Sequence, residues 1–229
     1  MITLSILAAG LLMCACAAVA QDAGVDKDIA NYEAKLDAEQ QRKADATAAV
    51  HVKELAQDSA SPFFGNPKAD VTIVVFSDYQ CPYCKAAEPR LMKLAAEDGN
   101  LKVVLKEFPI LGPESLVASK AALAAVKQNK YAAYHQAMMA NRGQLTNEVI
   151  FGTAKTVGLD VERLRKDMES SDIANQLLDN FILARSLKLT VTPAFIVDTH
   201  VLSGLTPKTS TSKTDFAAEV AAVRTARKK

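Results

Sequence analysis

Two cysteines separated by two residues, Cys81 and Cys84, are the side chains of this sequence best suited to chemistry. A Cys-x-x-Cys pair forms either half of a zinc site or a redox pair that opens and closes a disulfide. A structural zinc ion needs four ligands, and the histidines at positions 51, 135 and 200 show no metal-ligand spacing to one another. We therefore predict no metal site, expect no cofactor, and favour thiol chemistry.

The pair follows a predicted strand and precedes a predicted helix, which is the context that favours redox chemistry. Residues 71–76 form a short β-branched run, and residues 86–97 have helical composition with an apolar face. Cys81 would then lie at the start of the helix, where unpaired N–H groups and the positive end of the helix dipole stabilise a thiolate. We interpret Cys81 as the attacking residue and Cys84, one turn further along, as the resolving residue.

Four further residues belong to the predicted site. Pro82 stiffens the turn between the cysteines, and Tyr83 places a ring beside the sulfur. Thr192 and Pro193 precede residues 194–197, which we predict to be a strand. A cis bond, which an X–Pro pair adopts at modest cost, would bring the Thr192 backbone beside the cysteines, where an extended peptide could pair with it. The alternative is an ordinary trans proline that only interrupts the helical pattern.

Three acidic residues are candidates for tuning the thiolate or handling protons. Asp78 precedes the cysteine pair by three residues, Glu88 follows it by one helical turn, and Glu107 lies on a second predicted strand, residues 101–108. A nearby carboxylate changes the charge around a thiol and can exchange a proton with it. The alternative is a structural role for Asp78 and a solvated or ion-paired surface position for the two glutamates.

The remaining elements predict an α/β fold with a helical insertion. Strand, Cys-x-x-Cys, helix and strand form a βαβ unit between residues 71 and 108, and residues 113–187 are helical almost throughout by pattern. Residues 194–197 and 200–202 predict a hairpin, and residues 213–227 predict a closing helix. We therefore predict one domain over residues 61–229.

Residues 21–60 differ from this domain. They are rich in charged residues and alanine, contain no proline, and place Val25, Ile29, Tyr32 and Leu36 at helical spacing. We predict a helix over residues 26–55, followed by a loop and a domain boundary. Two interpretations stay open: a solvated helix or linker, and a coiled coil that assembles several chains.

The first twenty residues carry no charged side chain and end in Ala18-Val19-Ala20, which is typical of a secretory signal peptide cleaved after Ala20. The alternative is an uncleaved membrane anchor, because about 20 apolar residues are enough to span a bilayer. Cleavage would leave Cys81 and Cys84 as the remaining cysteines of an exported protein. Export places them in an oxidising compartment, where disulfides form and persist.

Composition excludes several classes of protein. Apolar residues make up 49% and charged residues 23% of the 229 residues, which is close to an ordinary soluble protein and excludes a wholly disordered or polytopic membrane chain. The formal net charge of +1 argues against a strongly basic nucleic-acid-binding protein.

Three blocks together resemble the DsbA-like thiol–disulfide oxidoreductases of bacterial envelopes. These blocks are FSDYQCPYCKAAEPRL from residue 76, KEFPILGPESLVASKAALAA from residue 106 and TVTPAFIVDTHVLSG from residue 190. The resemblance implies a thioredoxin fold with a helical domain inserted at about residues 113–187, a periplasmic location, and a Cys81–Cys84 redox pair facing Pro193. Lys188 and Val191 depart from the family, which often has glycine at these positions.

Within this family, the leading charged helix resembles that of the suppressor-of-copper-sensitivity C group, where such a segment assembles trimers. Thr192 resembles the isomerase and reductase branches more than the archetypal oxidase. The resemblance therefore implies an enzyme that forms, reduces or isomerises disulfides in exported proteins, with an unidentified redox partner and a homotrimeric assembly. The alternative is a redox-linked chaperone or a copper-responsive thiol protein without turnover, because two thiolates suit Cu(I).

Overall fold

The computed structural model describes residues 23–203 and 214–228. The predicted signal peptide, residues 1–20, lies outside these residues. The chain divides into two compact units, Met1–Glu39 and Gln40–Lys229. Within the described ranges, no helix combines the length and the apolar character that crossing a membrane requires.

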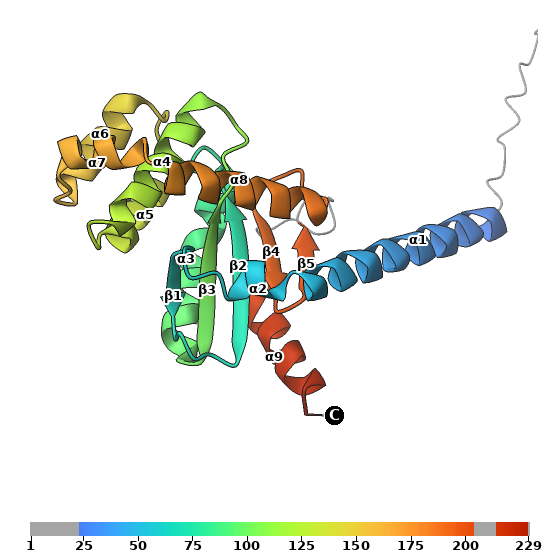
Figure 1. Cartoon of the computed structure of the whole chain (residues 1–229). Coiled ribbons are helices and arrows are strands. Elements are labelled where there is room, and N and C mark those ends of the chain that lie inside the picture. Colours follow the sequence, from blue (N-terminus) through green and yellow to red (C-terminus); the bar gives the residue numbers. More distant parts are fainter. Residues whose placement is uncertain (1–22, 204–213, 229) are drawn as a thin grey trace, which may run out of the picture. The chain divides into compact units, whose positions relative to one another are not determined.

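The second unit is built on a mixed five-stranded sheet in the order β1-β3-β2-β4-β5 (Figure 1). The strands are β1 (Phe63–Gly65), β2 (Val71–Ser77), β3 (Leu101–Glu107), β4 (Ala194–Val197) and β5 (His200–Ser203). β2 and β3 are parallel and joined by helix α3 (Pro82–Asp98), whereas the other pairs are antiparallel. The central strands are buried almost throughout, as expected of β-branched runs covered on both faces. The predicted βαβ unit and hairpin are therefore confirmed.

Strand β1 lies where a loop was expected. Phe63 pairs with Val104 of β3, and Gly65 pairs with Lys102. Gly65 has a φ of +83°, and a Cβ at this position would lie 2.2 Å from the carbonyl oxygen of Leu101. Glycine is therefore required at position 65, as the turn prediction implied, but it is required because the backbone of β1 passes very close to that of Leu101 at the edge of the sheet.

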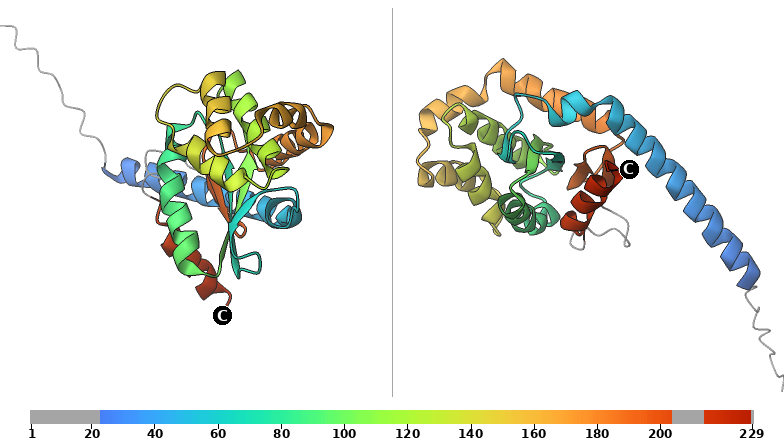
Figure 2. Two further views of the ribbon diagram at one scale, coloured as in Figure 1. Left: turned by 90° about the vertical axis from the view of Figure 1, so that its left-hand side faces the viewer. Right: turned by 90° about the horizontal axis from the view of Figure 1, so that it is seen from below.

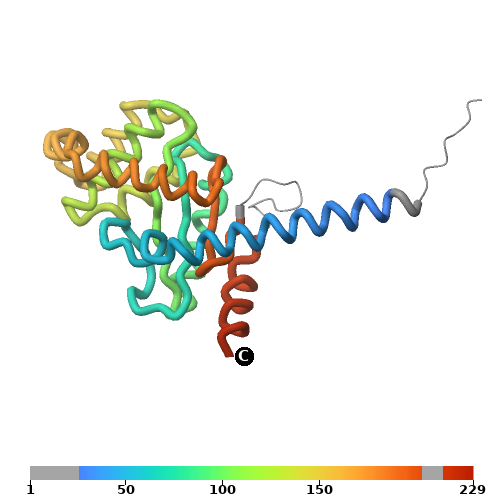
Figure 3. The backbone as a smooth tube through the Cα atoms, turned by 45° about the vertical axis from the view of Figure 1, so that its right-hand side comes forward, coloured from blue at the N-terminus to red at the C-terminus, as the bar shows by residue number. Residues whose placement is uncertain are grey.

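Helices cover both faces and one end of the sheet. They are α4 (Pro113–Val126), α5 (Tyr131–Ala140), α6 (Asn147–Thr156), α7 (Val161–Met168), α8 (Ser171–Ser186) and α9 (Phe216–Ala226). Helices α4 to α8 lie within the predicted insertion, residues 113–187. Of these, α4 to α7 gather at one end of the sheet, opposite to the C-terminal end of α9 (Figures 1 and 3). α3 and α9 pack on one sheet face, and α8 packs on the other (Figure 2). The side chains of Thr146 and Asp160 accept the backbone N–H groups that begin α6 and α7.

The segment before the sheet differs from the prediction. Instead of one helix over residues 26–55, α1 (Ala23–Val50) and α2 (Val52–Ala56) are separated at His51. The compact unit begins at Gln40, whereas the predicted domain begins at residue 61. The reason is burial, because Ala48 and Leu55 are fully buried in the core on the α8 face of the sheet.

This segment also covers the edge of the sheet. Asp45 Oδ1 accepts the backbone N–H of Val201 on β5 at 2.8 Å, and Gln41 Nε2 donates to the Val201 carbonyl at 2.9 Å. His200 Nδ1 lies 2.9 Å from Asp45 Oδ2. Two side chains of α1 therefore satisfy backbone groups of an edge strand that would otherwise be open to pairing with another chain.

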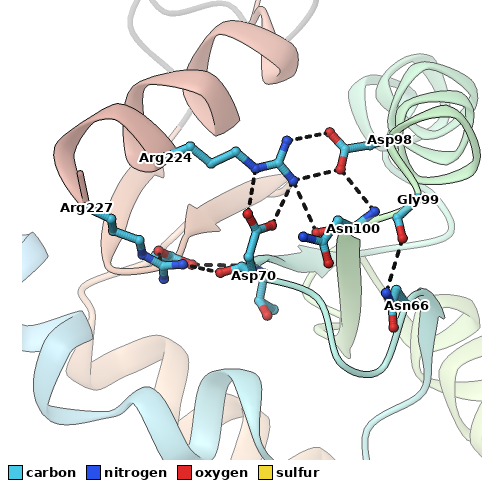
Figure 4. Close-up of polar contacts among 9 residues, drawn as sticks. Asn66, Asp70, Asp98, Gly99, Asn100, Arg224 and Arg227 are labelled. Atoms are coloured by element: carbon cyan, nitrogen blue, oxygen red, sulfur yellow. Dashed lines mark hydrogen bonds and ion pairs between the residues drawn. The ribbon is translucent and has the colours of Figure 1, made fainter.

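Arg224 fastens helix α9 to the sheet (Figure 4). Its Nε donates to Asp70, just before β2, at 2.9 Å, and its Nη2 donates to Asp98, at the end of α3, at 2.7 Å. Arg227 donates to the Asp70 carbonyl and to Asp198. Hydrogen bonds from Arg224 lower the pKa of both Asp70 and Asp98.

We expect Arg224→Ala to lower the free energy of unfolding by about 1 kcal/mol at pH 7. A bidentate network of hydrogen-bonded ion pairs stabilises a fold more than a single exposed ion pair does. Both carboxyl pKa values are depressed in the folded state, so the contribution is complete above the ordinary value of 3.8 and disappears as pH falls through the lower folded values. Urea unfolding at pH 7 and pH 3 measures the difference. Lys93→Ala, which breaks one exposed pair with Glu97, is the control; equal losses at pH 7 would contradict the expectation.

Candidate active site

Cys81 is the residue that caps the N-terminus of helix α3. Strand β2 ends at Ser77, and α3 begins at Pro82. The Cys84 backbone N–H donates to Cys81 Sγ at 3.2 Å, and the Cys81 thiol donates to the carbonyl oxygen of Thr192 at 3.2 Å. Both cysteines are buried free thiols. The predicted position of Cys81 at the helix start is thus confirmed.

The pKa values of the two thiols are shifted in opposite directions. Hydrogen bonding from the Cys84 side chain, with smaller help from Thr192 and the N–H groups of Cys84 and Tyr83, lowers the pKa of Cys81 from 9.0 to about 6. Burial, reinforced by the neighbouring Cys81, raises the pKa of Cys84 well above its ordinary value. Because the thiolate is the nucleophile, this difference in pKa favours Cys81 over Cys84 as the thiol that would attack.

The cis-proline loop faces this pair. The Thr192–Pro193 peptide bond is cis, as predicted. Thr192 is 6% exposed, and its carbonyl oxygen lies 3.2 Å from Cys81 Sγ. Lys188, where relatives often have glycine, adopts a φ of +56°. The turn therefore keeps the left-handed conformation that glycine favours, although a lysine occupies it.

Pro82 and Tyr83 lie in the first turn of α3, between the cysteines. Tyr83 is 50% exposed, so its ring borders the approach to the site from solvent. Pro82 occupies the first position of the helix, where its missing N–H costs nothing. These positions agree with the predicted active-site loop.

Asp78 has contacts that organise the loop. Its carboxylate accepts the backbone N–H groups of Gln80, Ile110 and Leu111 at 2.7, 2.8 and 3.0 Å, and the hydroxyl of Ser115 at 2.6 Å. The side chain is fully buried. It therefore ties the segment before Cys81 to the start of α4, which is the structural role named as the alternative to tuning.

The two glutamates are buried, so the alternative of surface charge is wrong for both. Glu88 is 8% exposed and Glu107 is 3% exposed. Glu107 accepts hydrogen bonds from the hydroxyls of Tyr79 at 3.0 Å, Tyr131 at 2.9 Å and Ser119 at 2.8 Å. Burial raises the pKa of Glu107, against the effect of these donors. The sequence did not reveal the burial of Glu107, because a strand that is buried on both faces reads as an apolar run, and one charged residue within it looks like a surface position.

His135 links the two glutamates. Its Nε2 lies 3.0 Å from Glu88 Oε1, and its Nδ1 lies 2.8 Å from the Tyr79 hydroxyl and 3.3 Å from that of Tyr131. Sequence analysis weighed His135 only as a zinc ligand and missed this role. We name these six residues the buried polar cluster; they are Tyr79, Glu88, Glu107, Ser119, Tyr131 and His135.

A metal site is not formed by this cluster. Within residues 23–203 and 214–228, no group of three or more histidine, cysteine, aspartate or glutamate side chains could hold a metal ion. The chemistry that the geometry supports is therefore that of the thiol pair: a Cys81 with a lowered pKa, a Cys84 with a raised pKa, and the cis-proline loop beside them.

Comparison with known proteins agrees with this chemistry. A family model described as thioredoxin matches residues 57–214. The chain belongs to the thioredoxin family. A thioredoxin-like oxidoreductase from Silicibacter pomeroyi DSS-3 is 37% identical, with a TM-score of 0.69, and the match covers 77% of this chain and 98% of that one.

Two other solved thioredoxin-family relatives carry more specific names. The thiol–disulfide exchange protein α-DsbA2 from Wolbachia pipientis is 27% identical, with a TM-score of 0.66, over 71% of this chain and 89% of that one. The catalytic domain of Proteus mirabilis ScsC is 30% identical, with a TM-score of 0.64, over 71% of this chain and 90% of that one. The predicted thioredoxin fold and the resemblance to DsbA-like and ScsC proteins are confirmed.

The chain spans about a fifth of the length of the first curated relatives it matches. One is the Na⁺/H⁺ antiporter NhaA 1 of Salinispora arenicola, which is 30% identical over 136 residues, or 58% of this chain and 21% of that protein. The likeness covers too little of the antiporter for its name to describe this chain.

Proposed function

We propose that this thioredoxin-family protein is an envelope thiol–disulfide oxidoreductase that acts on cysteines of exported proteins. One observation carries the proposal: Cys81 caps α3 with a lowered pKa and faces Thr192 across 3.2 Å, while the Cys84 thiol lies one turn behind it. This is the arrangement that thiol–disulfide exchange requires, because a thiolate must be paired with a resolving thiol. The charge-free N-terminal residues support export to the periplasm.

The proposed reaction is an exchange of sulfur–sulfur bonds. The Cys81 thiolate attacks a substrate disulfide, forming a mixed disulfide and releasing one substrate sulfur as a thiolate. Cys84 then attacks Cys81, so that the Cys81–Cys84 bond forms and the second substrate thiol is released. The same steps in reverse oxidise a substrate dithiol. A redox partner, still to be identified, returns the pair to its working state.

Thr192 and the leading helix support isomerisation as the direction of this chemistry. Thr192 resembles the isomerase and reductase branches of the DsbA-like proteins, and its carbonyl oxygen faces the Cys81 thiol at 3.2 Å. Isomerisation also gains from several sites that face one misfolded substrate. In the first compact unit, α1 exposes Ile29, Tyr32 and Leu36 to 52%, 64% and 39%. Their spacing places them on one helix face, and we define them as the apolar stripe.

We expect the protein to self-associate through the apolar stripe, most simply as a trimer. The variant Ile29→Glu/Leu36→Glu should be monomeric by light scattering, because charges in a helical seam oppose association. It should also refold scrambled ribonuclease more slowly per Cys81 site than the wild type. The control is Ala34→Glu/Ala38→Glu, which places the same charges on the opposite helix face.

The outcomes separate the two parts of this proposal. A monomeric wild type would contradict the proposed assembly. Equal refolding rates per site in the wild type and the Ile29→Glu/Leu36→Glu variant would contradict the proposed link between assembly and isomerisation. A thiol titration over repeated redox cycles tests for turnover. If the wild type binds scrambled ribonuclease but shows no turnover, the result would instead favour a redox-linked chaperone or a copper-responsive thiol protein.

A further inference from the structure

A groove on the sheet face that carries α8 takes no part in the exchange described so far. Helices α2 and α8 both pack on this face (Figures 1 and 2). Between them lies a cavity of about 660 Å³, which we name the α8 groove. Its volume is within the range of ligand-binding sites. Gln176 Nε2 of α8 donates to the carbonyl oxygen of Ala60, after α2, at 2.8 Å, so the two walls are tied together and the groove is preformed.

The charges of the α8 groove are mainly acidic. Four carboxylates and two lysines line it; they are Glu54, Asp58, Asp172, Asp179, Lys53 and Lys106. Lys106 is 2% exposed and donates to Asp58 Oδ2 at 2.8 Å, so these two charges neutralise each other. Asp172 is paired with Lys127 at 2.9 Å. Asp179 is exposed on α8 and has no hydrogen bond or ion pair within the part of the chain that the structure describes, so its carboxylate is available to a cation.

The opposite wall carries a second available carboxylate. Glu54 of α2 has a side chain that is 60% exposed, and His51 Nδ1 lies 3.9 Å from it. With His51 neutral at pH 7, the charge of Glu54 is not compensated by this contact. Lys53 is the other exposed charge of α2 in the lining. The available carboxylates therefore outnumber the available cation, and they lie on both walls.

The wall formed by α8 is long and partly apolar. Ile182 follows Asp179 by three residues and is 58% exposed, and Leu183 beside it is buried. Lining positions recur every three or four residues from Asp172 to Ser186, so they lie on one face of the helix. At about 1.5 Å per residue this face is roughly 21 Å long, which is the length of about six residues of extended chain.

We propose that the α8 groove binds an extended segment of the exported substrate, with a lysine or arginine facing Asp179 and Glu54 and an apolar side chain on Ile182. The inference rests on the proposed thiol–disulfide exchange and names its substrate class, which is exported proteins that carry a basic and apolar segment near a cysteine. Charge complementarity decides the occupant, because the two carboxylates attract cationic side chains and repel acidic ones.

The groove ends close in sequence to the loop that faces Cys81. Helix α8 ends at Ser186, and Thr192, whose carbonyl oxygen lies 3.2 Å from Cys81 Sγ, follows it within the same connection to β4. That connection spans at most about 21 Å. A substrate cysteine roughly six or more residues from the bound segment therefore reaches Cys81 while the segment stays in the groove. Binding at two points raises the effective concentration of this cysteine at the site.

Binding is tested without thiol chemistry. The probe is a dye-labelled, cysteine-free peptide of alternating lysine and leucine, and its counterpart replaces each lysine with glutamate. Fluorescence anisotropy with the full-length protein should show the basic peptide binding about tenfold more tightly, and salt should weaken this preference. Asp179→Lys should weaken the basic peptide about tenfold and strengthen the acidic one, because a favourable pair becomes a like-charge pair.

Matched variants separate the groove from the general surface. Ile182→Glu places a charge against the apolar part of the segment and should weaken binding of the basic peptide about tenfold through lost burial. Leu178→Glu makes the same change at a residue of α8 that is 56% exposed and lies outside the lining. Glu97→Lys reverses an exposed charge on α3, on the other face of the sheet. Both controls should bind the basic peptide as the wild type does.

The link to exchange is tested with the same peptides extended by about eight residues to a cysteine that is disulfide-bonded to glutathione. The Cys81 thiolate attacks this disulfide, one sulfur leaves as a thiolate, and Cys84 then resolves the mixed disulfide. The wild type should show a kcat/KM about tenfold higher for the basic than for the acidic substrate. Asp179→Lys should reverse this preference, which a merely structural role of Asp179 would not do.

The inference is overturned if the two peptides bind equally or if neither binds. In the latter case, a fall in mass of Ile182→Glu but not of Leu178→Glu by light scattering would assign the groove to a second copy of the chain. Reduction of oxidised glutathione by the wild type tests the proposed exchange alone, because glutathione is too short to occupy the groove and reach Cys81 together. Peptide binding without this reduction would retain the groove and remove the proposed function.

Discussion

The Cys81→Ser variant is expected to lose thiol–disulfide exchange to the uncatalysed level, whereas Cys84→Ser is expected to accumulate mixed disulfides through Cys81. The difference follows from the asymmetry of the pair. Cys81 receives the N–H of Cys84 at the helix start and has a pKa of about 6, while burial keeps Cys84 protonated. Removing the nucleophile stops the first step, and removing the resolving thiol stops only the second.

Scrambled ribonuclease is a suitable probe for this prediction. Non-reducing electrophoresis and mass spectrometry would detect covalent adducts, and peptide mapping would locate the bond at Cys81. The Cys81→Ser/Cys84→Ser double variant shows the background without either thiol. Adducts on the Cys81→Ser protein together with none on Cys84→Ser would reverse the assignment of the two roles.

The sequence predicted those parts of the fold that local pattern determines. Helix α7 (Val161–Met168) lies within the predicted helical run of residues 113–187, because Asp160 caps its start and Leu164 and Met168 bury one face. Residues 71–76 and 194–197 are strands because their β-branched and aromatic runs stand between turn signals. The cis bond before Pro193 was predicted from the combination of Cys-x-x-Cys, Thr-Pro and hairpin, since none of these alone distinguishes it from an ordinary proline.

Features that depend on distant contacts were missed. Asp45 and Val201 are far apart in sequence, so no local signal indicates that α1 covers the edge of β5 and belongs to the compact unit. Strand β1 has three residues, too few for periodicity. His135 contributes to the cluster only because α5 packs against α3, and a buried histidine has the same sequence appearance as a solvated one.

Thiolate formation at Cys81 in the reduced protein is expected to have its midpoint near pH 6, against 9.0 for an ordinary cysteine. Because the folded pKa is the lower one, the thiolate stabilises the reduced fold fully above pH 9, and this contribution is lost as pH falls through 6. At about 1.4 kcal/mol per pKa unit, the full contribution is about 4 kcal/mol, and about a third of it remains at pH 7.

The same stabilisation of the reduced form makes the pair more oxidising. Stabilising the reduced form at pH 7 raises the two-electron reduction potential by a few tens of millivolts relative to a pair with an ordinary Cys81, because about 30 mV corresponds to about 1.4 kcal/mol. Equilibration with glutathione at several pH values measures this shift. The potential should depend on pH with a break near 6, where Cys81 begins to ionise.

Two variants isolate the cause of the low pKa. A hydrogen bond from the Cys84 side chain is the largest contribution. Cys84→Ser retains an O–H donor and should keep the midpoint of Cys81 alkylation low, whereas Cys84→Ala removes the donor and should move the midpoint upward. The backbone N–H groups at the helix start remain in both variants, so a difference between them reports on the side chain. Identical midpoints in the two variants would assign the low pKa to the helix N-terminus, and a wild-type midpoint near 9 would contradict the thiolate altogether.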